Sequence, residues 1–129
     1  MELSMTLLKL IFRNLALMTV LLASTSLFAH NTVTKTTPAE GEVLMHSPEA
    51  LVLNFSDDTY LVTMELKTEE NLEVPLNVVR SVESSRHFSV PVPQLSAGKY
   101  TVNWLVEGDD THQIRGSYTF SVTGAAQAH

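Results

Sequence analysis

The sequence predicts an all-β domain of about seven short strands, arranged as an antiparallel Greek-key sandwich. After residue 30, apolar and polar residues alternate with the period of two that is typical of half-buried strands, and turn-forming residues interrupt these runs. Many short strands separated by turns are typical of a sandwich or a barrel. Removing the first 29 residues leaves 100, and about 100 residues is the usual size of a seven-stranded sandwich.

Each expected strand carries apolar side chains on one face. A first strand is expected over 31–37, and Asn71 opens a hairpin turn further along the chain. Pro91 and Pro93 confine their strand to an edge or an early end, because proline donates no hydrogen bond to a neighbouring strand. Trp104 is expected in the core between the sheets. The inward-facing positions, in chain order, are Leu51, Leu53 and Phe55; Val62, Met64 and Leu66; Leu76 and Val78; Phe88, Val90 and Val92; Tyr100, Val102, Trp104 and Val106; and Tyr118, Phe120 and Val122.

Residues 1–29 have the layout of a secretory signal peptide. Lys9 and Arg13 supply the positively charged region, and residues 15–22 form the apolar region. This apolar stretch is shorter than the roughly 20 residues that a membrane-spanning helix needs. We therefore expect cleavage rather than an uncleaved anchor, and no stable membrane anchoring of the processed protein.

Two cleavage sites fit this leader. Cleavage after Ala29 makes His30 the first residue, although Leu27 then stands at a position where small residues are preferred. Cleavage after Ser26 makes Leu27 the first residue instead. We expect the first of these, and we expect residues 125–129 at the other end of the chain to form a flexible tail.

The charge and composition exclude several classes of ligand. The net charge is −6; residues 1–29 hold two of the 8 basic and one of the 14 acidic side chains, so the remainder has 6 and 13 and a net charge of −7. Such a surface is poorly suited to nucleic acid or to an anionic membrane, and cations are its more natural ligands. Because there is no cysteine, the chain has no disulfide, no thiolate zinc site and no blue-copper centre.

The segment 107–118 holds the most informative side chains. It lies between two expected strands and carries a carboxylate and an imidazole two residues apart, at Asp110 and His112. Residues i and i+2 of an extended chain point to the same side, so both groups can converge on one ion. His30, just past the leader, supplies a second imidazole. The hypothesis is that cleavage before His30 frees its amine and that these three residues hold one copper ion.

Several short motifs occur in an order that resembles the CopC-type periplasmic copper-resistance proteins. The resemblance extends over about residues 30–123 of the chain. It begins with an Ala-His junction after the leader. The motifs that follow are Thr37–Gly41 (TPAEG), Leu53–Ser56 (LNFS), Ala97–Trp104 (AGKYTVNW), Asp110–His112 (DTH) and Gly116–Phe120 (GSYTF).

This resemblance implies a cupredoxin-like or immunoglobulin-like β-sandwich over 30–124 that binds Cu(II) and is not an enzyme. The family's site uses the amine and ring of an N-terminal histidine with the aspartate and histidine of an Asp-x-His motif. By motif, these are His30, Asp110 and His112. Asp57 stands where the family often has a glutamate near the copper, and its shorter side chain makes it a further, weaker candidate.

The implied ligands suit Cu(II), which heads the divalent affinity order and favours nitrogen and oxygen donors. The α-amine has an ordinary pKa of about 7.7–8.0, so it must lose a proton to bind, and affinity is expected to fall in acid. Some family members also bind Cu(I) through a methionine-rich loop. This chain has only Met45 and Met64 after the leader, so the resemblance points to a site for Cu(II) alone, with Met45 and His46 as a thin Cu(I) alternative.

Three functions remain open at this point. The first is a periplasmic carrier or buffer for copper resistance and homeostasis, which delivers the ion to an inner-membrane copper transport partner. The second is a metal-free sandwich module for adhesion or protein contact. The third is an oxidative copper enzyme, since copper monooxygenases also use an N-terminal histidine. It ranks last, because the sequence has no recognisable substrate-binding face and no hydrolytic or nucleotide motif.

Overall fold

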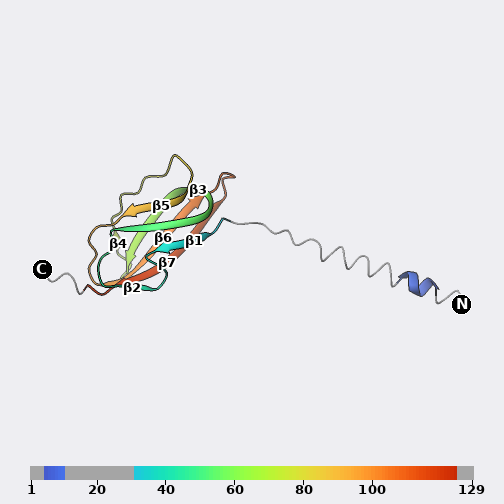
Figure 1. The fold of residues 1–129 in the computed structure, drawn as a ribbon, viewed down its shortest axis with the longest axis horizontal. Helices are drawn as coiled ribbons and strands as arrows, with labels where there is room; N and C mark the ends of the chain where they lie inside the picture. The colour runs from blue at the N-terminus through green and yellow to red at the C-terminus, as the bar shows by residue number, and fades with distance from the viewer. Residues whose placement is uncertain (1–4, 11–30, 125–129) are drawn as a thin grey trace. The chain divides into compact units, whose positions relative to one another are not determined.

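The structure is a computed structural model, and it describes residues 5–10 and 31–124 of the chain (Figure 1). Residues 5–10 are helical. Within the described residues, no helix is long and apolar enough to span a bilayer. Most of the predicted signal peptide, the predicted ligand His30 and the predicted tail over 125–129 lie outside the described residues.

Residues 31–124 contain seven strands that form two layers joined by one long strand (Figure 1). The first half of β3 lies between β1 and β5, whereas its second half pairs with β4 and β6, and the second layer continues through β7 to β2. The strands are β1 (Val33–Thr37), β2 (Glu42–Leu44), β3 (Ala50–Thr68), β4 (Glu73–Val74), β5 (Ser85–Pro91), β6 (Gly98–Glu107) and β7 (Gln113–Val122).

The all-β expectation is confirmed, and the pairing is antiparallel with one exception. β2 pairs with β7 in parallel, so the sheet is mixed. The prolines were expected to confine their strand to an edge or an early end, and β5 does end at Pro91 and pairs only with β3 among the described strands. The turn expected at Asn71 is also present, because Asn71 has a φ of 65° and its backbone N–H donates to the carbonyl of Thr68 at 2.9 Å.

The prediction of two separate strands across 51–66 is wrong, because β3 runs without a break for 19 residues. Residues 56–59, which we call the β3 bend, contain no turn that reverses the chain, and Figure 1 shows β3 curving there from one layer into the other. The register against β6 shifts between Leu61 and Thr63. A bulge of this kind changes which side chain faces inward, and it buries Leu61 in place of the expected Val62.

The core lies between the two layers and contains most of the predicted inward positions. Phe55 contacts Phe88 and Trp104 edge to face, with ring centroids 6.0 and 5.2 Å apart, a favourable aromatic geometry. Leu76 and Val78 pack against this core from a segment that is not a strand. The buried apolar residues are Leu51, Leu53, Phe55, Leu61, Met64, Leu66, Phe88, Val90, Leu95, Tyr100, Val102, Trp104, Val106, Tyr118, Phe120 and Val122.

Gly116 makes room for the tryptophan. The register of β6 and β7 places Trp104 directly opposite Gly116, and a Cβ atom on Gly116 would overlap the indole ring. We expect Gly116→Ala to lower the free energy of unfolding by about 2–3 kcal/mol, because the added methyl overlaps the indole ring and forces the ring or the strand to shift. Urea unfolding measures this. The exposed neighbour Ser117→Ala is the control and should change stability by less than about 0.5 kcal/mol; equal stability of both variants would contradict this packing.

Tyr118 carries a buried hydroxyl that has no hydrogen-bond partner among the described residues. The side chain is 4% exposed, and burial raises the pKa of its hydroxyl well above the ordinary value. In the unfolded chain this hydroxyl ionises near pH 10, as tyrosine does in water. The contribution of the protonated Tyr118 hydroxyl to the free energy of unfolding is therefore fully present below about pH 10, and it is lost as the pH rises above that value.

The variant Tyr118→Phe tests this hydroxyl. We expect it to raise the free energy of unfolding at pH 7 by about 1 kcal/mol, because the ring remains and an unsatisfied donor is removed. It should also reduce the loss of stability between pH 9 and pH 11 measured by urea unfolding. The half-buried Tyr60→Phe is the control; a loss of stability at pH 7 in the Tyr118 variant would show that the hydroxyl is satisfied in solution.

Candidate metal centre

The turn between β6 and β7 closes over residues 108–112. The backbone N–H of Gly108 donates to the carbonyl of His112 at 2.9 Å, and the N–H of Thr111 donates to the carbonyl of Gly108 at 3.0 Å. Thr111 has a φ of 66°, which is rare and strained for a β-branched residue. The turn thus holds a fixed, strained conformation between the two predicted ligands.

Asp110 and His112 are brought together, as predicted. Asp110 Oδ2 lies 2.9 Å from Nδ1 of the His112 ring, and Asp110 Oδ1 accepts the backbone N–H of His112 at 3.1 Å. Both side chains are largely exposed, at 69% and 84%. The reason given from the sequence is only partly right, however: β7 starts at Gln113, so the two groups converge through the left-handed Thr111 and not along an extended strand.

The electrostatics of this pair suit a cation. The backbone N–H of His112 is the main reason that the pKa of Asp110 is lowered, and the hydrogen bond and charge of the His112 ring add to this. Asp110 is therefore a carboxylate at neutral pH. When the neutral ring donates its Nδ1–H to this carboxylate, Nε2 carries the free lone pair. Such carboxylate–histidine pairs fix the tautomer and the orientation of a metal-binding imidazole.

The chain following His30 is tied to the β3 bend. Asn31 Oδ1 accepts hydrogen bonds from the backbone N–H of Asp57 at 3.1 Å and from the Ser56 hydroxyl at 3.2 Å. The backbone N–H of Thr32 donates to Ser56 Oγ at 3.0 Å, and the N–H of Ser56 donates to the carbonyl of Thr32 at 2.9 Å. Asn31 and Thr32 therefore have a defined place against β3.

The turn that carries Asp110 and His112 is tied to the same bend. The Thr59 hydroxyl, fully buried, donates to the carbonyl of Glu107 at 2.8 Å, and Tyr60 pairs with Glu107 in the sheet. The two anchor points on β3, at 56–57 and 59–60, are only about 6–14 Å apart at the rise of an extended chain. Figure 1 shows the start of β1 and the β6–β7 turn at the same end of the sandwich.

The other candidates are less closely associated with the Asp110–His112 pair. Asp57 is exposed, and its backbone rather than its carboxylate makes the contact with Asn31. Asp58 pairs with Arg86 at 3.8 Å. Over residues 5–10 and 31–124, no group of three or more metal-binding side chains gathers to hold an ion. The described part of the chain brings together two candidate ligands, Asp110 and His112.

Two contacts near the candidate site were not predicted from the sequence. The anchoring of Asn31 gives no motif, because an asparagine beside an expected strand usually indicates a turn. The second contact is an ion pair between Arg80 Nη2 and Glu107 Oε1 at 3.2 Å, in which the Glu107 side chain is only 19% exposed. This ion pair links the segment before β5 to the base of the β6–β7 turn, and only the tertiary structure brings the two residues together.

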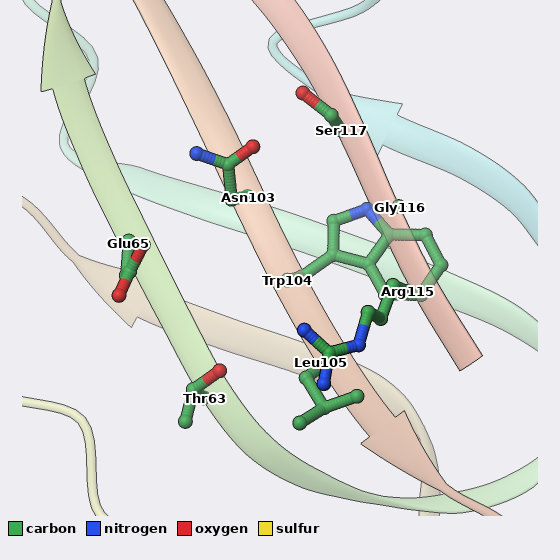
Figure 2. Close-up of a pocket in the computed structure, with 8 residues that line it drawn as sticks. All are labelled: Thr63, Glu65, Asn103, Trp104, Leu105, Arg115, Gly116 and Ser117. Carbon is green, nitrogen blue, oxygen red and sulfur yellow. The ribbon is translucent and has the colours of Figure 1, made fainter. Parts of the chain in front are cut away.

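A hollow lies on the outer face of β3, β6 and β7, and its lining does not suit a metal ion. Figure 2 shows the Trp104 indole at its floor, beside Gly116. Its volume is about 510 Å³, but its lining contains one carboxylate, Glu65, and no histidine. The space that a Gly116 side chain would take is filled by the indole ring.

Comparisons with known proteins agree with this fold. The model of the CopC domain matches residues 33–123. Protein YobA of Escherichia coli strain K12 is 33% identical over 112 residues, which cover 84% of this chain and 90% of that protein. Copper resistance protein C of Pseudomonas syringae pv. tomato is 32% identical over 102 residues, which cover 73% of this chain and 81% of that protein.

Two crystal structures have the same fold. CopC from Methylosinus trichosporium OB3b superposes with a TM-score of 0.65 at 19% identity, covering 78% of this chain and 100% of that one; this likeness shows the fold alone. PcoC, a methionine-rich copper resistance protein from Escherichia coli, superposes with a TM-score of 0.60 at 27% identity, covering 73% and 99%. The chain therefore belongs to the CopC family, whose members bind copper and are not enzymes.

Proposed function

We propose that this protein is a periplasmic Cu(II)-binding protein that carries or buffers copper, with one site at the end of the sandwich where β1 begins. Cleavage after Ala29 gives His30 a free amine. The amine and ring of His30, the ring of His112 and the carboxylate of Asp110 then hold the ion, and the hydrogen bond between Asp110 and Nδ1 of His112 must open for both groups to bind it. Asp57, whose backbone is bonded to Asn31, remains a further candidate near this end.

One observation carries the proposal. The residues next to His30 and the residues at the base of the Asp110–His112 turn are both anchored to the β3 bend. An amine and an imidazole on the same residue close a chelate ring on the metal, so their binding costs little additional chain entropy. A second imidazole and a carboxylate complete the set of nitrogen and oxygen donors that Cu(II) favours.

The surroundings also fit a carrier of copper cations. The processed chain has a net charge of −7, which attracts cations to the protein. The Asp110–His112 pair is highly exposed, so an ion held there is accessible to a second protein. We propose an inner-membrane copper transport partner as the recipient. The resistance function is supported by the relatives that are named copper resistance protein C.

An N-terminal extension tests the role of the amine. We expect the protein that starts at His30 to bind one Cu(II) more tightly than micromolar. We expect a Met-Ala extension to weaken binding by more than the roughly 10–100-fold that loss of a residue orienting a ligand costs. Competition titration against a chelator measures both. Equal affinities would rule out the amine as a ligand, whereas binding no tighter than micromolar by the processed protein would favour a metal-free interaction module.

Two histidine variants test the role of the turn. His112→Ala should weaken Cu(II) binding by more than about 100-fold, because it removes a direct ligand. His87→Ala is the matched control, since His87 is also exposed and its Nδ1 lies 2.8 Å from a side-chain oxygen, Asn54 Oδ1. It should leave the affinity unchanged. Similar losses in the two variants would show that the ion binds to surface histidines without selecting the turn.

A further inference from the structure

Asn31 makes contacts that a strand end does not require. The regular pairing of β1 with β3 begins at Val33, opposite Phe55, and its register shifts between Val33 and Lys35; ahead of it lies one backbone hydrogen bond, from Ser56 to Thr32. Residues ahead of a paired strand ordinarily fray. Here, one side-chain oxygen of Asn31 receives two hydrogen bonds from the β3 bend, from the backbone of Asp57 and the hydroxyl of Ser56.

The orientation of the Asn31 carboxamide is fixed by these contacts. A backbone N–H can only donate, so the Asn31 atom that faces Asp57 must be the oxygen. The amide nitrogen is then directed elsewhere, and it is buried without a hydrogen-bond partner in the part of the chain that the structure describes. Buried donors are rarely left unsatisfied, so this arrangement is maintained by the two bonds to the oxygen at the expense of the nitrogen.

We propose that Asn31 is a positioning residue for the copper site, because it fixes the chain directly after His30 against the β3 bend. The inference rests on the proposed function and goes beyond it. Two of the donors, the amine and ring of His30, are joined directly to Asn31. If the chain were free at this point, forming the site would require ordering of the terminus each time an ion binds. Anchoring before binding removes this cost from the affinity.

A purely structural role would have a different signature. If Asn31 only stabilised the end of β1, its removal would lower the free energy of unfolding and change copper affinity equally in any form of the protein. If it acts through the terminus, its effect depends on a free terminal amine. A double-mutant cycle between Asn31→Ala and the Met-Ala extension separates the two roles, because it isolates the coupling between the two changes.

The cycle uses four proteins: the processed wild type, the processed Asn31→Ala variant, the extended wild type and the extended Asn31→Ala variant. Cu(II) affinity is measured by chelator competition. In the processed protein, we expect Asn31→Ala to weaken binding by about 10–100-fold, as loss of a residue that orients a ligand does. In the extended protein, we expect a change of less than about threefold. The electron paramagnetic resonance spectrum of the processed variant should shift toward that of the extended wild-type protein.

Two further variants sharpen the test. Asn31→Asp keeps an oxygen in place to accept both hydrogen bonds, so its affinity should lie closer to wild type than that of Asn31→Ala. Asn103→Ala is the control, since Asn103 is equally half-buried but lies on the outer face of β6, and it should bind copper as the wild type does. Urea unfolding without metal checks that all variants fold.

The outcomes are distinct. No loss with Asn31→Ala, an equal loss in both forms, or no recovery with Asn31→Asp would each overturn the positioning role while leaving the copper function intact. If the processed and extended wild-type proteins bind equally, the N-terminal site itself is wrong, whatever the Asn31 variants do.

Discussion

The structure depends on the continuity of β3 through its bend. This strand lies in the first layer between β1 and β5, and then in the second layer against β4 and β6. Since both layers pair with it, their relative position is set by one piece of backbone. A strand with a turn in the middle would leave the two layers free to shift. The bend also exposes backbone groups outside the regular ladders, and those groups need partners.

The partners of the bend come from the two segments that matter for the proposed site. Ser56 and Asp57 bond to Asn31 and Thr32, and Thr59 bonds to Glu107. Segments that are about 80 residues apart in sequence are thereby held at one end of the sandwich. The Arg80–Glu107 ion pair, with the glutamate largely buried, adds a further tie at the base of the turn. The frame is hydrogen-bonded on both sides of the bend, and the candidate ligands Asp110 and His112 remain exposed.

Sequence periodicity was sufficient to predict β6 and β7, because their inward positions alternate without interruption from Tyr100 to Val106 and from Tyr118 to Val122. It failed in β3. Periodicity records which residues are apolar, but not that a bulge transfers burial from Val62 to Leu61. It also gives no sign of strand direction, so the parallel pairing of β2 was not expected.

The candidate site was also predicted only in part from the sequence. The spacing of Asp110 and His112 predicted that their side chains converge, and the two side chains are in contact. The contact depends on the left-handed conformation of Thr111. A threonine gives no indication of that conformation in the sequence. The anchoring role of Asn31 depends on Ser56 and Asp57, and only the folded structure brings these residues together. Residues that act through tertiary hydrogen bonds are therefore the ones that sequence analysis misses.

The central claim is that one ion joins the new terminus to the Asp110–His112 turn. Electron paramagnetic resonance of the processed protein with one equivalent of Cu(II), with histidine labelled with nitrogen-15, tests it most directly. The account predicts a tetragonal Cu(II) signal with three coordinated nitrogens, all of them labelled: the amine and one ring nitrogen of His30, and one ring nitrogen of His112. A signal with a single labelled imidazole nitrogen would contradict it, because the terminus and the turn would then not share the ion.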